Sequence, residues 1–106
     1  MKKNLAFMVQ FDIKPEYLKE FTESLLLVLN NMSVEESFVS CYLHKDPKDE
    51  TKFAVYEIWS EPSMEAFFEN QLKTKDYRQE YEKKIATWLK EDRIITVLEP
   101  MQEWHK

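Results

Sequence analysis

Hydrophobic and polar positions alternate along residues 5–13. Every odd position in this stretch is apolar: Leu5, Phe7, Val9, Phe11 and Ile13. Successive side chains of a β-strand point to opposite faces, so this period of two predicts a strand with one wholly apolar face. The even positions start with Ala6 and Met8, so we expect the other face to be apolar where the strand begins.

The next stretch has a helical period. Its apolar residues recur at steps of three and four: Leu18, Phe21, Leu25, Val28, Leu29 and Met32. This spacing predicts an amphipathic helix over residues 15–31. Pro15 and Glu16 suit the first turn, because proline is tolerated there and an acidic side chain complements the helix dipole.

Two further strands are predicted over residues 38–45 and 52–60. In the first, alternation groups Phe38, Ser40, Tyr42 and His44 on one face and Val39, Cys41 and Leu43 on the other. In the second, it groups Phe53, Val55, Glu57 and Trp59 on one face and Ala54, Tyr56 and Ile58 on the other. The polar residues 46–51 between them, which include Pro47, predict a hairpin with a longer loop.

Two helical stretches and a strand complete the pattern. Ser60 or Ser63 is placed to cap a helix whose apolar residues are Met64, Phe67, Phe68 and Leu72. After a break near Lys73, Thr74 is placed to cap a helix with one face formed by Tyr77, Tyr81, Ile85, Trp88 and Leu89. Residues 93–99 predict the last strand, and residues 100–106 form a tail.

The order of these elements predicts the fold class. A β-α-β-β-α-β order is typical of the ferredoxin-like α+β fold, a four-stranded antiparallel sheet with helices on one face. The opposite face is also expected to be apolar, since it carries Met8, Ala54, Tyr56, Ile58, Ile94 and Leu98. An apolar sheet face needs a cover, and a second copy of the chain is the simplest one, so we expect a homodimer.

Size and composition limit the possible functions. A length of 106 residues suits one domain, residues 1–106. The net charge of -5 argues against a nucleic-acid partner, because such partners bind to basic surfaces. The chain has no glycine, so it lacks the glycine-rich loops through which many proteins bind the phosphates of NAD, FAD or ATP.

The sequence also predicts where the protein is found. No apolar stretch approaches the roughly 18 residues of a membrane span, and the first residues lack the pattern of a signal peptide. Cys41 is the only cysteine, so an internal disulfide is ruled out. We therefore expect a cytoplasmic protein with no membrane partner.

Four sequence motifs are distinctive: Phe-Asp-Ile-Lys-Pro-Glu at 11–16, Leu-His-Lys-Asp-Pro at 43–47, Phe-Ala-Val-Tyr-Glu-Ile-Trp at 53–59 and Gln-Leu-Lys-Thr at 71–74. Together they resemble the antibiotic biosynthesis monooxygenase family, whose members are dimeric α+β barrels. The resemblance implies oxygenation of small aromatic or quinol-like substrates with no metal, flavin, haem or other cofactor. Where many members carry histidines near the middle helix, this chain has Asn70, Gln71 and Asp76.

Glu57 is the first candidate for chemistry. It is a carboxylate in the middle of an apolar strand, where burial raises a carboxyl pKa. A base with a raised pKa is suited to removing the proton of a phenolic substrate. The alternative is structural: Glu57 forms an ion pair or a hydrogen bond that ties strands together at a dimer interface.

His44 is the second candidate. It lies two residues from Asp46, and a histidine oriented by a carboxylate is suited to moving protons near neutral pH. The alternative is a solvated residue at the end of a strand. Together His44 and Asp46 supply too few ligands for a catalytic zinc, so no metal site is assigned.

Aromatic side chains are predicted to bind the substrate. Those on the helices are Phe67, Phe68, Tyr77, Tyr81 and Trp88, and those on the strands are Tyr42 and Trp59. A pocket lined by such rings suits a flat apolar molecule, although their helical spacing predicts core packing equally well. Trp104 and His105 in the tail either hold the partner subunit or fray.

These observations lead to two hypotheses. In the first, the protein is a monooxygenase that needs no cofactor, with Glu57 and His44 transferring protons and the aromatic residues positioning the substrate ring. In the second, it is a dimer of the same fold that binds a small ligand, or serves a stress response, without catalysis.

Overall fold

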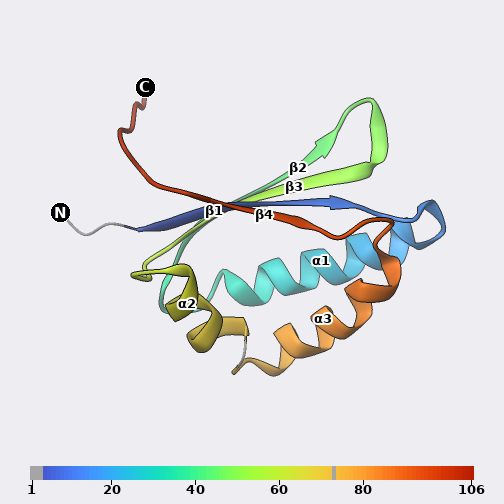
Figure 1. The fold of residues 1–106 in the computed structure, drawn as a ribbon, viewed down its shortest axis with the longest axis horizontal. Helices are drawn as coiled ribbons and strands as arrows, with labels where there is room; N and C mark the ends of the chain where they lie inside the picture. Colours follow the sequence, from blue (N-terminus) through green and yellow to red (C-terminus); the bar gives the residue numbers. More distant parts are fainter. Residues whose placement is uncertain (1–3, 73) are drawn as a thin grey trace.

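The computed structural model describes residues 4–72 and 74–106. Two layers are evident in Figure 1: a sheet, and helices that all lie beneath it. The elements in chain order are β1 Leu5–Asp12, a 3-10 turn Pro15–Tyr17, α1 Leu18–Met32, β2 Phe38–Asp46, β3 Asp49–Trp59, α2 Met64–Phe67, a π-helical turn Phe68–Leu72, α3 Asp76–Trp88 and β4 Ile94–Leu98. No helix within the described ranges is both long and apolar enough to cross a membrane.

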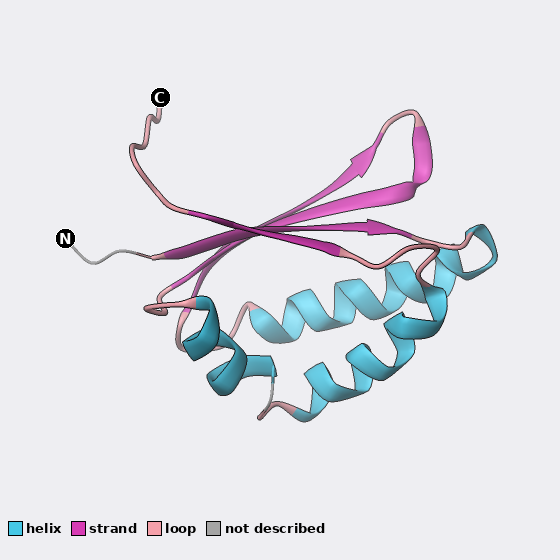
Figure 2. Ribbon diagram, in the orientation of Figure 1, coloured by secondary structure: helices cyan, strands magenta, loops and turns pink. Residues whose placement is uncertain are grey.

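The four strands form one antiparallel sheet in the order β2-β3-β1-β4. This arrangement confirms the predicted ferredoxin-like α+β fold, with helices on one face only (Figure 2). We call the face toward the helices the inner face and the opposite face the outer face. The central strands are β1 and β3, so the inner side chains of these two strands are the most deeply covered.

A β-bulge in β2 corrects one predicted face. Phe38 is opposite Trp59 while Ser40 is opposite Ile58, so one extra residue, Val39, is accommodated between them. The prediction that Phe38 shares a face with Ser40 and the later even-numbered residues of β2 is therefore wrong. Phe38 lies on the inner face and contacts Trp59 edge-on, with ring centroids 5.3 Å apart.

The β2–β3 hairpin is tighter than predicted. Asp46 is already paired with Asp49, so the loop consists of Pro47 and Lys48. The Asp46 carboxylate accepts a hydrogen bond from the backbone N–H of Lys48 at 2.8 Å. Such a bond lets an aspartate close a turn without glycine, which explains why a longer loop is not needed.

The two predicted helix caps have different outcomes. Ser63 caps α2 by accepting a hydrogen bond from the N–H of Ala66 at 3.1 Å, which confirms one of the two predicted positions. The predicted cap at Thr74 is wrong: Lys75 precedes α3, and the Thr74 hydroxyl donates to the carbonyl oxygen of Asn70. The break predicted near Lys73 lies outside the described residues.

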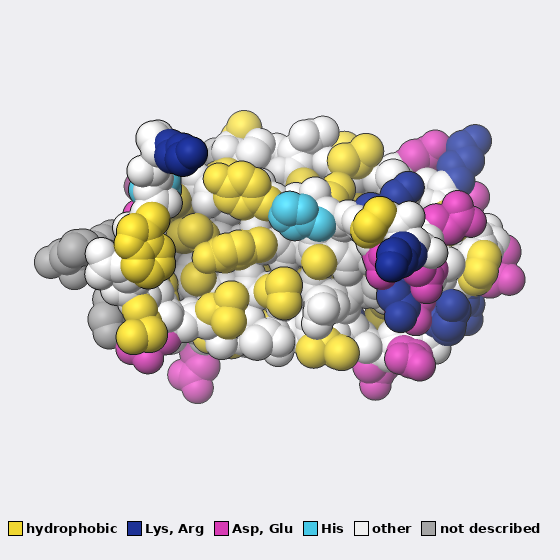
Figure 3. Space-filling view, turned by 90° about the horizontal axis from the view of Figure 1, so that it is seen from above, with side chains coloured by type: hydrophobic (Ala, Val, Ile, Leu, Met, Phe, Trp, Pro, Cys, Tyr) yellow, Lys and Arg dark blue, Asp and Glu magenta, His cyan; other side chains and the backbone are white. Residues whose placement is uncertain are grey.

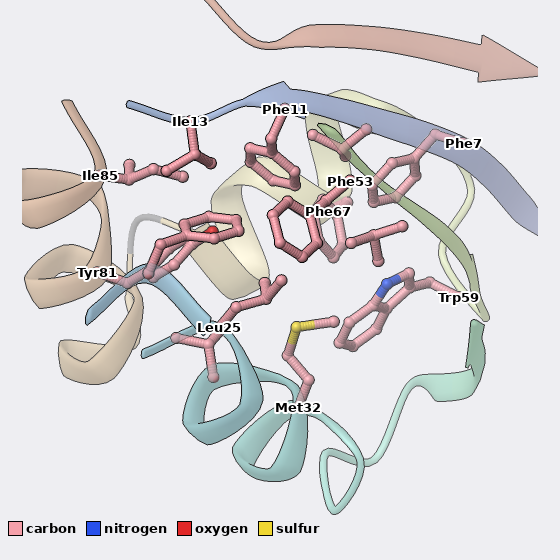
Figure 4. Packing of buried hydrophobic residues seen from close by; sticks show 14 of the residues in the cluster. Phe7, Phe11, Ile13, Leu25, Met32, Phe53, Trp59, Phe67, Tyr81 and Ile85 are labelled. Atoms are coloured by element: carbon pink, nitrogen blue, oxygen red, sulfur yellow. The ribbon is translucent and has the colours of Figure 1, made fainter. Parts of the chain in front are cut away.

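The core lies between the inner face and the helices (Figure 4). Its largest fully buried side chains include Trp59, Phe21 and Phe67. Phe67 contacts both central strands, with ring centroids 5.1 Å from Phe7 and 4.9 Å from Trp59. This aromatic packing fixes the position of α2 against the sheet.

The outer face is apolar over its centre (Figure 3). Three of its exposed apolar side chains are Tyr42, Ile94 and Leu98, which are 57%, 59% and 40% exposed. Charged side chains gather instead at one end of the view in Figure 3. An apolar surface of this kind is typical of a protein interface.

Replacing Phe67 with alanine tests the packing of α2. We expect Phe67→Ala to lower the free energy of unfolding by about 3–5 kcal/mol, because it removes a fully buried ring from the core. The matched control is Phe68→Ala, since Phe68 is 50% exposed and we expect a change within about 1 kcal/mol. Urea unfolding measures both, and equal losses in the two variants would contradict this packing.

Candidate functional site

A small cavity lies beneath the sheet, between the inner face and helices α1, α2 and α3. Its volume is about 50 Å³. Apolar side chains form most of its wall, but five polar or charged residues also line it: Glu57, Arg78, Tyr81, Glu82 and Arg93. Groups of this kind are expensive to bury, so their position in one cavity marks it as the candidate site.

Glu57 lies at the centre of β3 on the inner face and is only 5% exposed. Trp59 follows two residues later on the same face, and its indole Nε1–H donates to the Glu57 carboxylate at 3.0 Å. Burial raises the pKa of Glu57, while the positive charge of Arg78, the Trp59 hydrogen bond and the charge of Arg93 act in the opposite direction. The raised pKa suits a proton acceptor.

Arg78 enters the cavity from the first turn of α3 and is also 5% exposed. Its guanidinium lies over two aromatic rings, 5.8 Å from the centroid of Trp59 and 5.4 Å from that of Phe67. Its Nε and Nη2 atoms are buried and have no hydrogen-bond partner among the described residues. The aromatic rings stabilise the cation, but they leave these two donors unused.

The remaining polar groups of the cavity differ in how well they are satisfied. Arg93 forms two hydrogen bonds with the carboxylate of Glu82, so this pair neutralises itself. The Tyr81 hydroxyl is buried, with no hydrogen-bond partner in the described part of the chain, and burial raises its pKa. The cavity therefore offers a carboxyl group, a guanidinium and a neutral phenol to any molecule inside it.

The cavity brings together only some of the residues predicted to act on a substrate. Glu57, Phe67 and Tyr81 line it, and Trp59 contacts three of its residues directly. Phe68 does not line it and is half exposed.

The two remaining helix aromatics also lie away from the cavity. The Tyr77 hydroxyl donates to the carboxylate of Glu35 at 3.0 Å, and Trp88 stacks on Tyr17 with ring centroids 6.5 Å apart. Both rings are thus used to join elements of the fold.

His44 and Tyr42 lie on the outer face. His44 is opposite Ala54 and Tyr42 is opposite Tyr56, whereas Glu57 points to the inner face. The sheet therefore separates His44 from Glu57, and the two predicted proton-transfer residues do not share one cavity. His44 lines an open depression of about 440 Å³ on the outer side, which is larger than the inner cavity but holds no buried charge.

Cys41 lies across from Glu57 on the neighbouring strand. Burial, together with the negative charge of Glu57, raises the pKa of the Cys41 thiol to about 12. A thiol with this pKa is protonated at neutral pH and is a poor nucleophile. Cys41 is therefore best described as a partly buried packing residue.

The described residues also show whether a metal ion can be held. Across residues 4–72 and 74–106, no group of three or more His, Cys, Asp or Glu side chains is arranged so that it could hold a metal ion. The cavity itself contains two carboxylates, of which Glu82 is already bonded to Arg93.

The comparison with known families decides what kind of protein this is. The model of the antibiotic biosynthesis monooxygenase family matches residues 5–86, which is most of the chain. The chain belongs to this family. The sequence motifs predict membership of this family, and the match confirms the prediction.

Several solved structures have the same fold as this chain. A structure named antibiotic biosynthesis monooxygenase has a TM-score of 0.80 at 18% identity and covers 92% of this chain and 99% of its own. A Mycobacterium tuberculosis protein has a TM-score of 0.80 at 17% identity, over 94% of this chain and 97% of its own. A conserved protein of Methanosarcina mazei has a TM-score of 0.81 at 13% identity, over 94% of this chain and 95% of its own. Identities this low show the fold alone, and no curated protein matches the sequence significantly.

Sequence reasoning about this family member missed Arg78. The helix was predicted to place Tyr77, Tyr81 and Ile85 on one face, yet a helical step of three also joins Arg78 to Tyr81, and a step of seven joins it to Ile85. Arg78, Tyr81 and Ile85 are indeed the buried residues of α3. A charged residue in register with an apolar stripe was the signal that would have found it.

The raised pKa of Glu57 predicts how stability depends on pH. The unfolded chain ionises Glu57 at an ordinary pKa, so wild-type stability falls as pH rises from that value to the folded pKa. Glu57→Gln keeps an acceptor for Trp59 but cannot ionise. We expect this variant to match the wild type at about pH 4 and to be more stable by about pH 8. Urea unfolding of both proteins across this pH range tests the prediction. It would be contradicted if the wild type became more stable than Glu57→Gln as the pH rises.

Proposed function

We propose that the protein is a monooxygenase that acts without a cofactor on a small aromatic or quinol-like substrate. The observation that carries this proposal is the buried Glu57 carboxyl, which has a raised pKa and lies among aromatic side chains in a cavity of an antibiotic biosynthesis monooxygenase fold. A base in such a position meets its substrate away from water, where proton transfer creates a reactive anion.

The proposed reaction starts with proton transfer to Glu57. The O–H bond of a phenolic or enolic substrate breaks, its proton passes to the carboxylate, and the ring becomes electron-rich. A carbon of this anion then reacts with O₂. One oxygen atom becomes a carbonyl on the substrate, and the other leaves as water with two hydrogen atoms from the substrate. Trp59 and Phe67 would position the ring.

The cavity has to widen for this substrate. Its 50 Å³ admits a few water molecules or one oxygen-bearing group, whereas a cavity known to bind benzene has a volume of about 150 Å³. Met32 and Met64 line the cavity, and methionine side chains adapt their shape readily. We propose that the substrate ring displaces these side chains while its oxygen occupies the existing space.

We further propose that the protein works as a cytoplasmic homodimer. The apolar outer face provides the surface, and two copies related by a twofold axis would each cover the face of the other. The depression beside His44 would then lie at or near the interface, so a catalytic role for His44 would require the substrate to bind on that side. A reducing compartment suits the single free cysteine.

The small size of the cavity favours a second candidate function. A dimer that binds a small ligand without turning it over needs only the space now present. The two functions differ in oxygen consumption, because a binding protein would hold its ligand without using O₂.

Oxygen uptake with a panel of hydroquinones and anthrones tests the catalytic proposal. We expect turnover by the wild type and a loss of about a hundredfold or more in Glu57→Gln, which cannot accept a proton. His44→Asn distinguishes the inner cavity from the outer depression. If this variant lost oxygen uptake while Glu57→Gln kept full activity, the reaction would have to take place on the outer face. Binding with no turnover by the wild type would favour the second function.

Sedimentation of two lysine variants tests the proposed interface. Ile94 is 59% exposed on the outer face and Leu27 is 63% exposed on α1, so the two positions are matched in exposure. We expect Ile94→Lys to shift a micromolar dimer to monomer, since a charge would be buried between the sheets, and Leu27→Lys to leave it dimeric. A wild type that sediments as a monomer would refute the dimer.

A further inference from the structure

Arg78 is a buried cation with unused donors. Leaving a buried hydrogen-bonding group without a partner costs about 1–3 kcal/mol, and more when the group is charged. The other arginine of the cavity, Arg93, avoids this cost by pairing with Glu82. Arg78 does not, since its Nε and Nη2 are buried and unbonded within the described residues.

The geometry of Arg78 indicates what would satisfy it. The guanidinium Cζ lies 5.8 Å from the ring centroid of Trp59 and 5.4 Å from that of Phe67, so the two rings restrict its position. The two unbonded atoms, Nε and Nη2, lie on the same edge of the guanidinium and form one fork of parallel N–H donors. This fork matches an oxyanion, either two oxygens of a carboxylate or one oxygen shared by both donors.

We propose that Arg78 binds the oxyanion that forms when Glu57 takes the proton of a ligand hydroxyl. This inference rests on the proposed function and narrows its substrate class to phenols and enols, whose oxygen becomes negative in the cavity. The hydroxyl O–H bond breaks and a carboxyl O–H bond forms on Glu57. The ligand oxygen then replaces Glu57 as the negative charge that faces Arg78, so the cavity keeps the same net charge.

The other charged groups around Glu57 are compatible with this exchange. The titratable residues that line the cavity or face Glu57 are Arg78, Tyr81 and Glu82 from α3, Arg93 before β4, and Cys41 from β2. Helix α1 contributes only apolar side chains to the cavity wall: Leu25, Val28, Leu29 and Met32. Cys41 and Tyr81 are neutral because their pKa values are raised, and Glu82 is paired with Arg93. Arg78 is therefore the cation with donors left for a new anion.

Anaerobic binding of 4-nitrophenol tests the proposal, because only the ionised form of this phenol absorbs visible light. We expect the wild-type protein to bind it in the ionised form at a pH where the free phenol is largely neutral. Arg78→Gln is expected to weaken binding by about tenfold to a hundredfold, which corresponds to the loss of hydrogen bonds to a charged group. Formate, which fits the present cavity without widening it, serves as a second probe by calorimetry.

Two further variants provide controls. Arg93→Gln removes the same charge from the same cavity, but from a guanidinium whose partner is Glu82, so we expect it to bind 4-nitrophenol within about threefold of the wild type. Arg78→Met keeps the volume without the charge, and we expect its thermal midpoint to match or exceed that of the wild type. A stable Arg78→Met variant that no longer binds either probe shows that the loss is not caused by unfolding.

The outcomes separate this inference from the proposed function. Equal binding by Arg78→Gln and Arg93→Gln, bound 4-nitrophenol that stays neutral, or binding of neither probe by the wild type would overturn the role of Arg78. Oxygen turnover that survives intact in Arg78→Gln would also overturn it while leaving the monooxygenase proposal in place. Ionised binding that depends on Arg78, without oxygen uptake on any substrate, would refute only the monooxygenase proposal.

Discussion

Two opposite charges are buried in one small cavity beneath the sheet, and the account of this protein depends on how they are neutralised. The Glu57 carboxyl has the Trp59 indole as its hydrogen-bond donor, and the Arg78 guanidinium rests on the aromatic rings of Trp59 and Phe67. Some polar atoms of the cavity stay unsatisfied, because two donors of Arg78 and the hydroxyl of Tyr81 have no partner among the described residues. A purely structural site would replace such charges with apolar side chains at little cost in stability. The unsatisfied donors are therefore better understood as a site prepared for a ligand.

The two faces of the sheet have different tasks in this account. The inner face supplies the aromatic core and the cavity, and the helices keep water away from Glu57. The outer face is apolar over its centre and is not covered by any described residues of the same copy, which is why a dimer is proposed. His44 and Tyr42 belong to this outer face, so their importance depends on what lies against it. The proposed chemistry and the proposed assembly are thus separated by the thickness of one sheet, although the surfaces for both originate in the alternating pattern of the strands.

Much of the fold could be predicted from the sequence, because period-two and helical patterns in the strands and helices reflect which side chains are buried. The features that could not be predicted depend on contacts between distant residues. The bulge that turns Phe38 inward arises from pairing with Trp59, and the tight hairpin depends on the Asp46 side chain closing the turn. At the site, Glu57 was identified because a carboxylate in an apolar strand stands out locally. Arg78 was missed because a charge on a helix is usually solvated, and only the three-dimensional packing of α3 shows that it is buried.

The central claim is that Glu57 is a buried carboxyl that holds its proton more tightly than an ordinary glutamic acid. Infrared spectroscopy tests it directly, since the neutral carboxyl group has a C=O stretching band that disappears on ionisation and is assigned by its loss in Glu57→Gln. The account predicts that this band persists as pH rises above the ordinary range of glutamate and is lost only at higher pH. A band that is lost within the ordinary range, or below it, would contradict the account.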